Sequence, residues 1–371
     1  MSFEFRGHVL APESLGPCRV VVEDDRIAAI EPSRDAPEGT WIVPGLVDIQ
    51  LNGAFGVDFA APEGLDTARA RIAASGVTTF LATLVSASPG AYAAPLAALV
   101  PDEAPGLARL AGVHLEGPWL SPTYPGAHDP AALRPPSAAE LTAFLEPGTV
   151  RLVTLAPELT GGLAAVSRLT EAGVAVALGH TNADEATMRA ALHAGATIGT
   201  HLFNAMRPFH HRDPGAAGAL LDASCAVTLI ADGVHVSDAA LRLAWAAKGV
   251  TRFALISDGV APLGMSPGRY RVGTWDVTSD GAVCRLAGGT LAGSVTPLIA
   301  GVRRLVACGV RFAEAIRAAT ETPARLVGID AGRLAVGGPA DLVVLDDGLR
   351  PVAVLAGGVS PRLRQPSASG R

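Results

Sequence analysis

Eight short apolar segments rich in Val, Ile and Leu recur along the middle of the chain. Nearly continuous runs of this kind are typical of strands buried on both faces of a parallel sheet. Between them lie Ala-rich stretches of helical period, such as 162–173 and 184–195, which predict helices that end at glycine. Eight alternations of strand and helix predict an α/β fold, a (β/α)8 barrel of the TIM type. The eight runs are 42–49, 77–84, 110–115, 150–156, 174–178, 196–201, 226–231 and 252–257.

Both ends of the chain depart from this rhythm. Residues 19–31 have the pattern of a hairpin, and residues 341–355 hold two more short strand-like runs. We therefore expect the two termini, 1–43 and 332–371, to meet in one small β-sandwich domain. The barrel then occupies residues 44–331.

A second departure follows the eighth run. Turn signals at Asp280-Gly281 and Gly288-Gly289 predict a β insertion at about 270–292. Beyond the insertion, apolar residues at helical spacing predict an amphipathic helix over 295–306, with Ser294 as its N-cap.

Composition narrows the class of protein. With 371 residues, 49% hydrophobic and 17% charged, the chain can bury a barrel core and a smaller module and gives no sign of disorder. A net charge of −6 and the lack of a basic run argue against nucleic acid as a partner. No stretch of 18 apolar residues and no signal peptide are apparent, so we expect a cytoplasmic protein without a membrane partner.

Two residue types exclude further mechanisms. The four cysteines are widely spaced without a CxxC motif, so we expect small buried or half-buried side chains, with neither disulfides nor a thiolate metal site. Lys248 is the only lysine, and it lies where a helix is expected to end. A Schiff-base lysine, a P-loop lysine or a carboxylated lysine between two metals would each have to be this residue, which disfavours all three.

The carboxyl ends of the eight runs carry many ligand-type residues, at the face where barrel active sites lie. Glu116, His180 and His201 end the third, fifth and sixth runs, and one Glu with two His is a ligand set of catalytic zinc sites. Any one of them could be an ordinary hydrogen-bonded residue, but the three together predict a metal site. The complete set of strand-end residues is Gln50, Asn52, Glu116, His180, His201, Asp232, His235 and Asp258.

Asp258 ends the eighth run within Ala-Leu-Ile-Ser-Asp-Gly. A carboxylate in apolar surroundings must be hydrogen-bonded, paired or used in chemistry. Beside a metal site it can accept a proton from the attacking water and return it to the leaving amine, and capping the next turn is the alternative. His114, two residues before Glu116 on the same side of its strand, is expected to be a core or supporting histidine.

The segment 200–215 holds candidates for binding an anion. The guanidinium group of Arg212 could make bidentate hydrogen bonds to phosphate oxygens, assisted by the backbone amides around Asn204 and Ala205. The alternative is that Arg212 forms a surface ion pair with Asp213. For His210 and His211, loop packing and ligand contact both remain open.

Taken in order, these segments resemble the N-acetylglucosamine-6-phosphate deacetylases of the amidohydrolase superfamily over nearly the whole chain. A single tetrapeptide would be weak evidence, whereas the order and coverage of all of them make the resemblance specific. The segments that carry it are 43–53, 112–119, 126–130, 178–183, 200–206, 231–236, 256–259 and 339–345.

The resemblance implies the same metal ligands and makes Asp258 the catalytic carboxylate. It further implies that His128 polarises the substrate carbonyl or contacts the sugar. Four residues would contact the substrate, and two of these, Arg212 and His235, would reach the site of the neighbouring subunit in a homodimer. The four are Asn204, Ala205, Arg212 and His235.

Two positions depart from related patterns. Many amidohydrolases carry His-x-His at the end of the first strand to bind a second metal, whereas this chain has Gln50 and Asn52. Neutral amides are poor zinc ligands, so we expect one divalent ion per subunit, zinc above iron or another metal, with both amides beside the substrate. Asp129 stands where the family often has Asn, which leaves the sugar contacts less defined.

These observations predict hydrolysis of the acetamide of N-acetylglucosamine-6-phosphate to glucosamine-6-phosphate and acetate. Three alternatives remain open from the sequence. The first is the same reaction on the galactosamine epimer or another N-acyl sugar phosphate. The second is deamination of a heterocycle, and the third is a barrel that has lost catalysis and acts as a binding protein.

Overall fold

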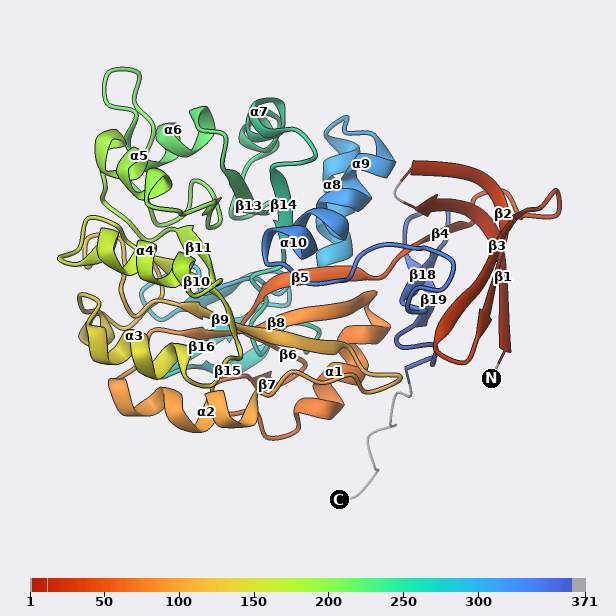
Figure 1. The fold of residues 1–371 in the computed structure, drawn as a ribbon, viewed down its shortest axis with the longest axis horizontal. Coiled ribbons are helices and arrows are strands. Elements are labelled where there is room, and N and C mark those ends of the chain that lie inside the picture. The colour runs from red at the N-terminus through yellow and green to blue at the C-terminus, as the bar shows by residue number, and fades with distance from the viewer. Residues whose placement is uncertain (1, 12, 362–371) are drawn as a thin grey trace.

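The barrel is the centre of the structure, a computed structural model that describes residues 2–11 and 13–361 (Figure 1). Eight strands form one parallel sheet in the order β14-β13-β12-β11-β10-β9-β8-β5. Each predicted run overlaps one of them, so the barrel prediction is confirmed. The strands are β5 (Leu46–Leu51), β8 (Val77–Val85), β9 (Arg109–Glu116), β10 (Val150–Leu155), β11 (Ala175–Leu178), β12 (Ile198–Gly199), β13 (Ala226–Ile230) and β14 (Phe253–Ile256).

The sheet closes where β14 meets β5. The amide of Asp258 donates to the carbonyl of Gln50 at 3.0 Å, and the amide of Asn52 donates to the carbonyl of Gly259 at 2.7 Å. The closing hydrogen bonds therefore come from the segments that carry candidate site residues, which fixes those segments relative to one another.

Helices surround the strands, and their ends follow local sequence signals. Asp184 caps one helix by accepting from the amide of Thr187 at 2.8 Å, and Ser237 caps another by accepting from the amide of Ala240 at 3.3 Å. The helices are α1 (Leu65–Ala74), η1 (Pro89–Tyr92), α2 (Ala93–Ala98), η2 (Pro130–Ala132), α3 (Ala138–Leu145), α4 (Gly162–Glu171), α5 (Glu185–His193), α6 (Gly215–Asp222), α7 (Asp238–Lys248), α8 (Leu298–Ala307), α9 (Phe312–Ala318) and α10 (Glu321–Leu326).

Of two expectations about helix ends, one is wrong and one is confirmed. Helix α8 begins at Leu298 with Pro297 at the N-cap position, so Ser294 does not cap it. Lys248 does end α7, but it is 1% exposed, and its Nζ donates to the carbonyls of Ala223 and Cys225 at 2.6 and 3.1 Å. The lysine therefore binds the α6–β13 connection rather than capping its own helix.

The core has a layer inside the barrel and a layer between strands and helices. The inner layer consists of apolar side chains from most of the strands, together with Ala324 of α10 and Val327, which follows that helix. The outer layer packs the other strand faces against helices, and it includes Leu255 of β14 and Val302 of α8, two elements in contact. Burial on both faces explains why the strand sequences are nearly continuous in apolar residues.

Both termini contribute to one six-stranded sheet, in the order β19-β18-β4-β1-β2-β3, beside the barrel (Figure 1). Backbone hydrogen bonds join Ile27 of β3 to Gly337 and Gly338, ahead of β18, so the sheet folds back around a small core of its own. The domain boundaries at 43/44 and 331/332 stay a prediction, and residues 362–371 lie outside the described part. The strands are β1 (Ser2–Ala11), β2 (Glu13–Glu23), β3 (Arg26–Pro32), β4 (Trp41–Pro44), β18 (Leu342–Leu345) and β19 (Pro351–Leu355).

The segment after β14 forms a three-stranded antiparallel sheet of β15 (Gly268–Val272), β16 (Trp275–Ser279) and β17 (Cys284–Leu286). It lies where the sequence predicts a β insertion. A short pair, β6 (Gly53–Ala54) and β7 (Val57–Asp58), follows β5.

All four cysteines are free and buried or half-buried, as expected. Among the described residues, no helix has the length and apolar character needed to cross a membrane.

Candidate metal centre and active site

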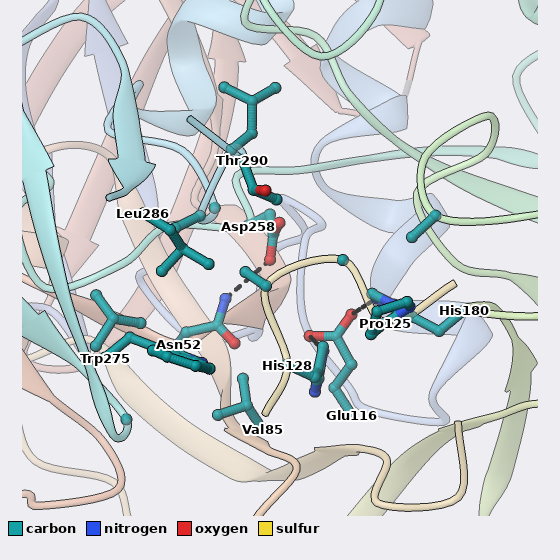
Figure 2. A pocket seen from close by; sticks show the side chains of 18 of the residues that line it. Asn52, Val85, Glu116, Pro125, His128, His180, Asp258, Trp275, Leu286 and Thr290 are labelled. Carbon is teal, nitrogen blue, oxygen red and sulfur yellow. Dashed lines mark hydrogen bonds and ion pairs between the residues drawn. The ribbon is translucent and has the colours of Figure 1, made fainter. Parts of the chain in front are cut away.

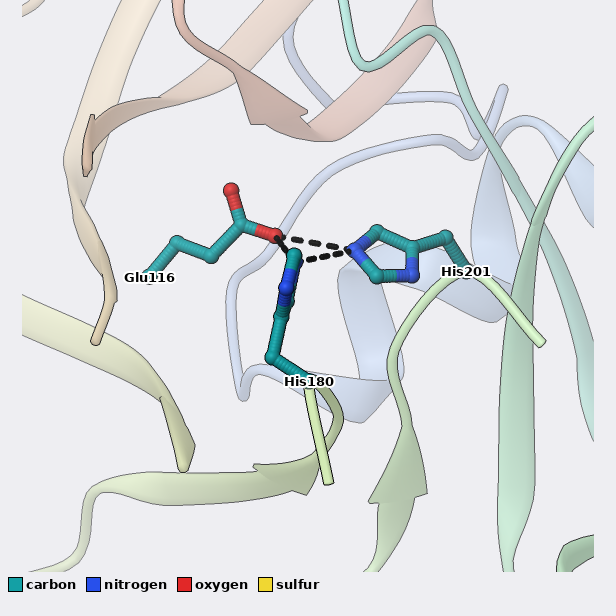
Figure 3. Close-up of side chains that lie close together, drawn as sticks. All are labelled: Glu116, His180 and His201. Atoms are coloured by element: carbon teal, nitrogen blue, oxygen red, sulfur yellow. Dashed lines mark hydrogen bonds and ion pairs between the residues drawn. The ribbon is translucent and has the colours of Figure 1, made fainter. Parts of the chain in front are cut away.

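Glu116, His180 and His201 converge at the carboxyl end of the barrel (Figure 3). Oε1 of Glu116 lies 3.2 Å from Nε2 of His180 and 3.0 Å from Nε2 of His201, and the two Nε2 atoms are 3.0 Å apart. The three side chains are 4–6% exposed. The structure thus brings together the three residues that the sequence selected as metal ligands.

The donor atoms of this cluster suit a divalent ion. Nδ1 of His180 lies 3.1 Å from the carbonyl of Tyr124, which can only accept, so Nδ1 carries the proton and the neutral ring presents the Nε2 lone pair to the cluster. A lone pair and a carboxylate held together without water are unfavourable unless a cation lies between them. Donors 2.0–2.1 Å from a tetrahedral ion are roughly 3.3 Å apart, close to the observed spacing.

The charges within the cluster agree with this fit. Burial would raise the pKa of Glu116, but its contacts with His128, His180 and His201 outweigh burial and hold that pKa well below its usual value. Burial lowers the pKa of His180. A carboxylate and a neutral imidazole are the forms that bind metal ions.

Backbone conformation also marks this part of the barrel. His180, His201 and Asp258 have φ angles of 48°, 29° and 49°, in the left-handed region that side chains with a Cβ seldom adopt. Each is the second residue after the end of a barrel strand. Such strained backbone persists where the surroundings fix it, and it is frequent at active sites.

Asp258 lies between two amide side chains. Nε2 of Gln50 donates to Oδ1 of Asp258 at 3.2 Å and to Oε1 of Glu116 at 2.9 Å, and Nδ2 of Asn52 donates to Oδ1 of Asp258 at 2.8 Å. Burial, followed by the charge of Glu116, raises the pKa of Asp258 to about 7. Asp258 therefore holds or releases a proton near neutral pH, as a general acid–base requires.

The side chains of Gln50 and Asn52 differ in whether they line the cavity. Gln50 is 1% exposed and is not among the residues of the cavity wall, and its side chain joins Glu116 to Asp258. The expectation that it contacts the substrate stays a prediction. Asn52 does line the cavity. Both side-chain amides direct N–H groups at carboxylates, whereas a metal ligand directs a lone pair at the ion.

His128 lies against the cluster in a defined orientation. The amide of Ser86 donates to Nδ1 of His128 at 3.2 Å, and Oγ of Ser86 is 2.9 Å from the same atom. Since Nδ1 accepts, the neutral ring carries its proton on Nε2, which lies 3.7 Å from Oε2 of Glu116. His128 thus presents an N–H group beside the metal cluster.

A cavity of about 510 Å³ opens over these residues (Figure 2). Its size falls within the range of small-molecule sites. Its wall includes nearly all of the site residues selected from the sequence, and Asp129 also lines it. Those selected residues are Asn52, Glu116, His128, His180, His201, Asn204, Ala205, His235 and Asp258.

The loop after β12 is only partly within the cavity. Arg212 is exposed and is not among the lining residues, and its Nη1 lies 2.9 Å from Nε2 of His211. Arg207, rather than Arg212, pairs with Asp213, at 2.5 Å. Arg212 has no carboxylate partner among the described residues, which leaves it free to bind an anion outside its own cavity. His210 and His211 are also exposed.

His235 is held inside its own chain. Its Nδ1 donates to Oδ2 of Asp232 at 2.7 Å, its side chain is 7% exposed, and it lines the cavity. The Asp232 pair holds the ring over the cavity of its own chain, and the expectation that His235 reaches the site of a neighbouring subunit stays a prediction. Burial would lower the pKa of His235, but the hydrogen bond and charge of Asp232 outweigh burial and raise it.

His114 confirms the supporting role that its position suggested. It is fully buried, with Nε2 2.8 Å from Oγ1 of Thr154 and Nδ1 3.3 Å from Oγ1 of Thr83. Burial lowers the pKa of His114 to about 4. A neutral histidine bound to two hydroxyls beneath the cluster stabilises the strand ends without joining the metal donors.

Several contributors were not identified from the sequence. Ser86 fixes His128, Ser294 donates to Oδ2 of Asp232 at 3.0 Å, and Trp275 extends the cavity wall from the insertion. Ser86 directly follows the second barrel strand, so the strand-end criterion could have included it. Neither Ser294 nor Trp275 had such a signal, because both belong to loops or strands outside the barrel.

Comparison with known proteins gives consistent matches. The chain matches the model of the amidohydrolase family over residues 41–364. A Bos taurus protein named N-acetylglucosamine-6-phosphate deacetylase is 40% identical over 377 aligned residues, which cover 95% of this chain and 89% of that protein. An Escherichia coli O157:H7 protein named N-acetylgalactosamine-6-phosphate deacetylase is 39% identical, covering 88% of this chain and 90% of that protein.

Solved structures agree with these sequence matches. A mutant of N-acetyl-D-glucosamine-6-phosphate deacetylase from Mycobacterium smegmatis, in complex with N-acetyl-D-glucosamine-6-phosphate, is 40% identical with a TM-score of 0.89. The match covers 96% of this chain and 98% of that one.

Proposed function

The chain belongs to the amidohydrolase family, and from this membership we propose that it hydrolyses the acetamide of N-acetylglucosamine-6-phosphate to glucosamine-6-phosphate and acetate. One observation carries the proposal: three metal-type donors, Asp258 and the N–H of His128 face one cavity in a chain 40% identical to deacetylases over nearly its full length. The hydrolytic class follows from the family, and the substrate is the proposed part.

We propose that Glu116, His180 and His201 hold one divalent ion per chain, with zinc as the preferred metal. When bound, such an ion polarises the substrate carbonyl and lowers the pKa of a water molecule. Carboxylate and imidazole ligands suit zinc, and they also accommodate iron. Gln50 and Asn52 direct N–H groups toward Asp258, which supports a single ion.

Asp258 is the proposed general base and acid. Its carboxylate accepts a proton from the attacking water, and the protonated form then donates that proton to the amine nitrogen as the C–N bond breaks. The two amide donors hold Oδ1, while burial keeps the proton affinity near neutrality. Nε2 of His128 donates to the carbonyl oxygen as negative charge develops there.

The far side of the cavity suits the sugar phosphate. The segment of Asn204 and Ala205 lines it, and so does His235, whose pKa is raised by Asp232, so that its positively charged form is favoured. We propose that exposed Arg212 serves the phosphate of a neighbouring subunit in a homodimer, as the family resemblance implies. The homodimer and a cytoplasmic location stay predictions.

The galactosamine epimer is a second candidate substrate, because a relative 39% identical bears that name. A comparison of kcat/KM on the two epimers, with bound metal counted in the same preparation, tests both substrate and stoichiometry. We expect one ion per chain and faster deacetylation of the glucosamine compound. Faster turnover of the galactosamine compound would reverse the assignment, and release of ammonia without acetate would point to a deaminase.

Asp258→Asn tests the mechanism. We expect the variant to keep its metal and lose about a hundredfold or more in kcat, because the amide cannot carry the proton. Asp347→Asn, at an exposed aspartate outside the barrel, is the matched control and should retain full activity. Turnover of Asp258→Asn close to that of the control would remove Asp258 from the role proposed for it.

A further inference from the structure

The cavity has one wall that neither the metal cluster nor the sugar contacts explain. Val85 ends β8, and Trp275 and Leu286 come from the insertion. In Figure 2 these side chains lie with Asn52 on one side of Asp258 and Glu116, while Pro125 and His180 lie on the other side. Val272, Leu291 and Ala292 also line the cavity.

The insertion is fixed over this part of the barrel. The amide of Gly273, in the turn between β15 and β16, donates to Oδ2 of Asp58 at 2.5 Å. A Cβ placed on Gly273 would lie 3.4 Å from Val85, so the turn lies directly on the end of β8. Val277 and Cys284, buried on the insertion, share a core with Val260 next to the site. The apolar wall is therefore part of the folded structure at the end of the first two barrel strands.

The polar contacts lie elsewhere. Asn204 and Ala205 follow β12 and His235 follows β13, and these strands are separated from β5 and β8 in the barrel order. The loop after β12 thus gives the cavity a polar half for the sugar phosphate, and the end of β8 with Trp275 and Leu286 gives it an apolar half. His235 lies near Asp258, and its partner Asp232 accepts from Ser294, which follows the insertion. The inference that follows rests on the proposed function, because it uses the position of the scissile amide.

The geometry of an amide assigns the apolar half. A trans amide places the substituent on its carbonyl carbon and the substituent on its nitrogen at opposite ends of a plane. With the sugar in the polar half and the carbonyl beside His128 and Asp258, the acyl group points toward Trp275 and Leu286. An acetyl group presents only one methyl to this wall.

We propose that the apolar half is an acyl pocket that accepts unbranched chains longer than acetyl, so that the protein also removes propionyl and butyryl groups from the same sugar phosphate. The reaction is unchanged: water oxygen bonds to the acyl carbon, the C–N bond breaks, and the nitrogen takes its proton from Asp258. The products are the longer carboxylate and the free amine. Leu286 and Trp275 set the chain length that fits.

The test compares kcat/KM for the N-acetyl, N-propionyl and N-butyryl forms of glucosamine-6-phosphate on metal-loaded protein. We expect the two longer substrates to be hydrolysed within about tenfold of acetyl, since each methylene placed against apolar walls strengthens binding by about fourfold. Butyryl turnover more than a hundredfold below acetyl would overturn the acyl pocket.

Leu286→Phe narrows the pocket and Trp275→Ala widens it. We expect the butyryl-to-acetyl ratio of kcat/KM to fall about tenfold or more in the first variant and to rise in the second. Leu15→Phe, at a leucine 52% exposed in the terminal sheet, is the matched control and should leave the ratio at its wild-type value. Thermal melting of each variant shows whether it is folded.

The outcomes separate the two proposals. Equal losses on all three substrates in Leu286→Phe would place Leu286 against the sugar and overturn the acyl pocket. Turnover of acetyl alone by the wild type would do the same while leaving the deacetylase proposal intact. No turnover of any of the three by metal-loaded wild type would overturn the deacetylase proposal, and the acyl pocket with it.

Discussion

Asp232→Asn isolates the positive charge that His235 brings to the cavity. In the wild type, Oδ2 of Asp232 accepts from Nδ1 of His235 at 2.7 Å and from Oγ of Ser294 at 3.0 Å. Oδ1 accepts from the amides of Val234 and His235 at 2.8 and 2.9 Å. Asparagine can keep the two backbone bonds with its oxygen, but its NH2 group then faces Nδ1. His235 must accept that hydrogen bond, which the protonated ring cannot do.

The size of the effect follows from the burial of the pair. Both side chains are under 10% exposed, so solvent screens their interaction little. A hydrogen bond to a charged partner contributes about 1.5–3 kcal/mol, which corresponds to roughly 10- to 150-fold. The hydrogen bond from His235 to Asp232 favours the protonated ring, which binds the sugar phosphate. We therefore expect the substitution to raise KM by this factor and to change kcat less.

The pH dependence gives a sharper result than one measurement. In the wild type the pKa of His235 is raised, so its charge is present at lower pH and is lost as pH rises through that pKa. In Asp232→Asn burial dominates and the pKa falls below its usual value, so the charge is lost at a lower pH. The KM ratio of variant to wild type should therefore grow as pH rises from 5 to about 7. Titration of the substrate phosphate is common to both proteins and cancels in the ratio.

Steady-state KM for N-acetylglucosamine-6-phosphate from pH 5 to 9 measures this, with the metal content of both proteins kept equal. Asp330→Asn, at an exposed aspartate that pairs with Arg333, is the matched control. A KM ratio that stays near one at every pH would show that the charge of His235 does not bind substrate. A large but pH-independent ratio would show that Asp232 acts on the fold of the loop instead.

Three further changes have defined outcomes. Glu116→Gln removes the carboxylate from the donor set, and we expect metal analysis after dialysis to find less than about a tenth of the wild-type content. Ser86→Ala removes one of two contacts to Nδ1 of His128 while keeping the backbone amide, so kcat should fall only about three- to tenfold, and a loss as large as that of His128→Ala would contradict this. Lys248→Met leaves two buried carbonyls without their partner and should lower the free energy of unfolding by about 2–4 kcal/mol in urea titration, whereas Arg333→Met on the surface should change it little.

The barrel was predictable because its strands are buried on both faces. This burial makes each strand a continuous apolar run, and even β12, only Ile198–Gly199 in the structure, lies within a longer run that ends at His201. The helix after the insertion was found as well, but its start was not. Ser294 has the chemistry of a cap, yet it lies beside the end of β14 and its hydroxyl binds Asp232 at the end of the neighbouring strand β13, 62 residues away in sequence. Local preference cannot anticipate a tertiary partner of this kind.

In the site, too, some features could be predicted from local sequence and others depend on tertiary contacts. Glu116, His180, His201 and Asp258 were predictable because a barrel collects its strand ends at one face. The direction of Gln50 was not, since one residue at a strand end can face the cavity or the neighbouring carboxylates. Trp275 was beyond reach because its place depends on the contact between Gly273 and Asp58, 215 residues apart. Contacts of this length come from folding of the whole chain rather than from a local pattern.

The amides at the end of β5 also define how Asp258 can act. Gln50 and Asn52 both donate to Oδ1, and within residues 2–11 and 13–361 no hydrogen bond reaches Oδ2. Oδ2 is therefore the atom available to take and return a proton, and its direction is fixed because the opposite oxygen is held by two donors. Histidines at these positions would instead offer nitrogen ligands that can bind a second cation beside the carboxylate. The proposed single metal and a carboxylate with one free oxygen are thus both explained by the same pair of residues.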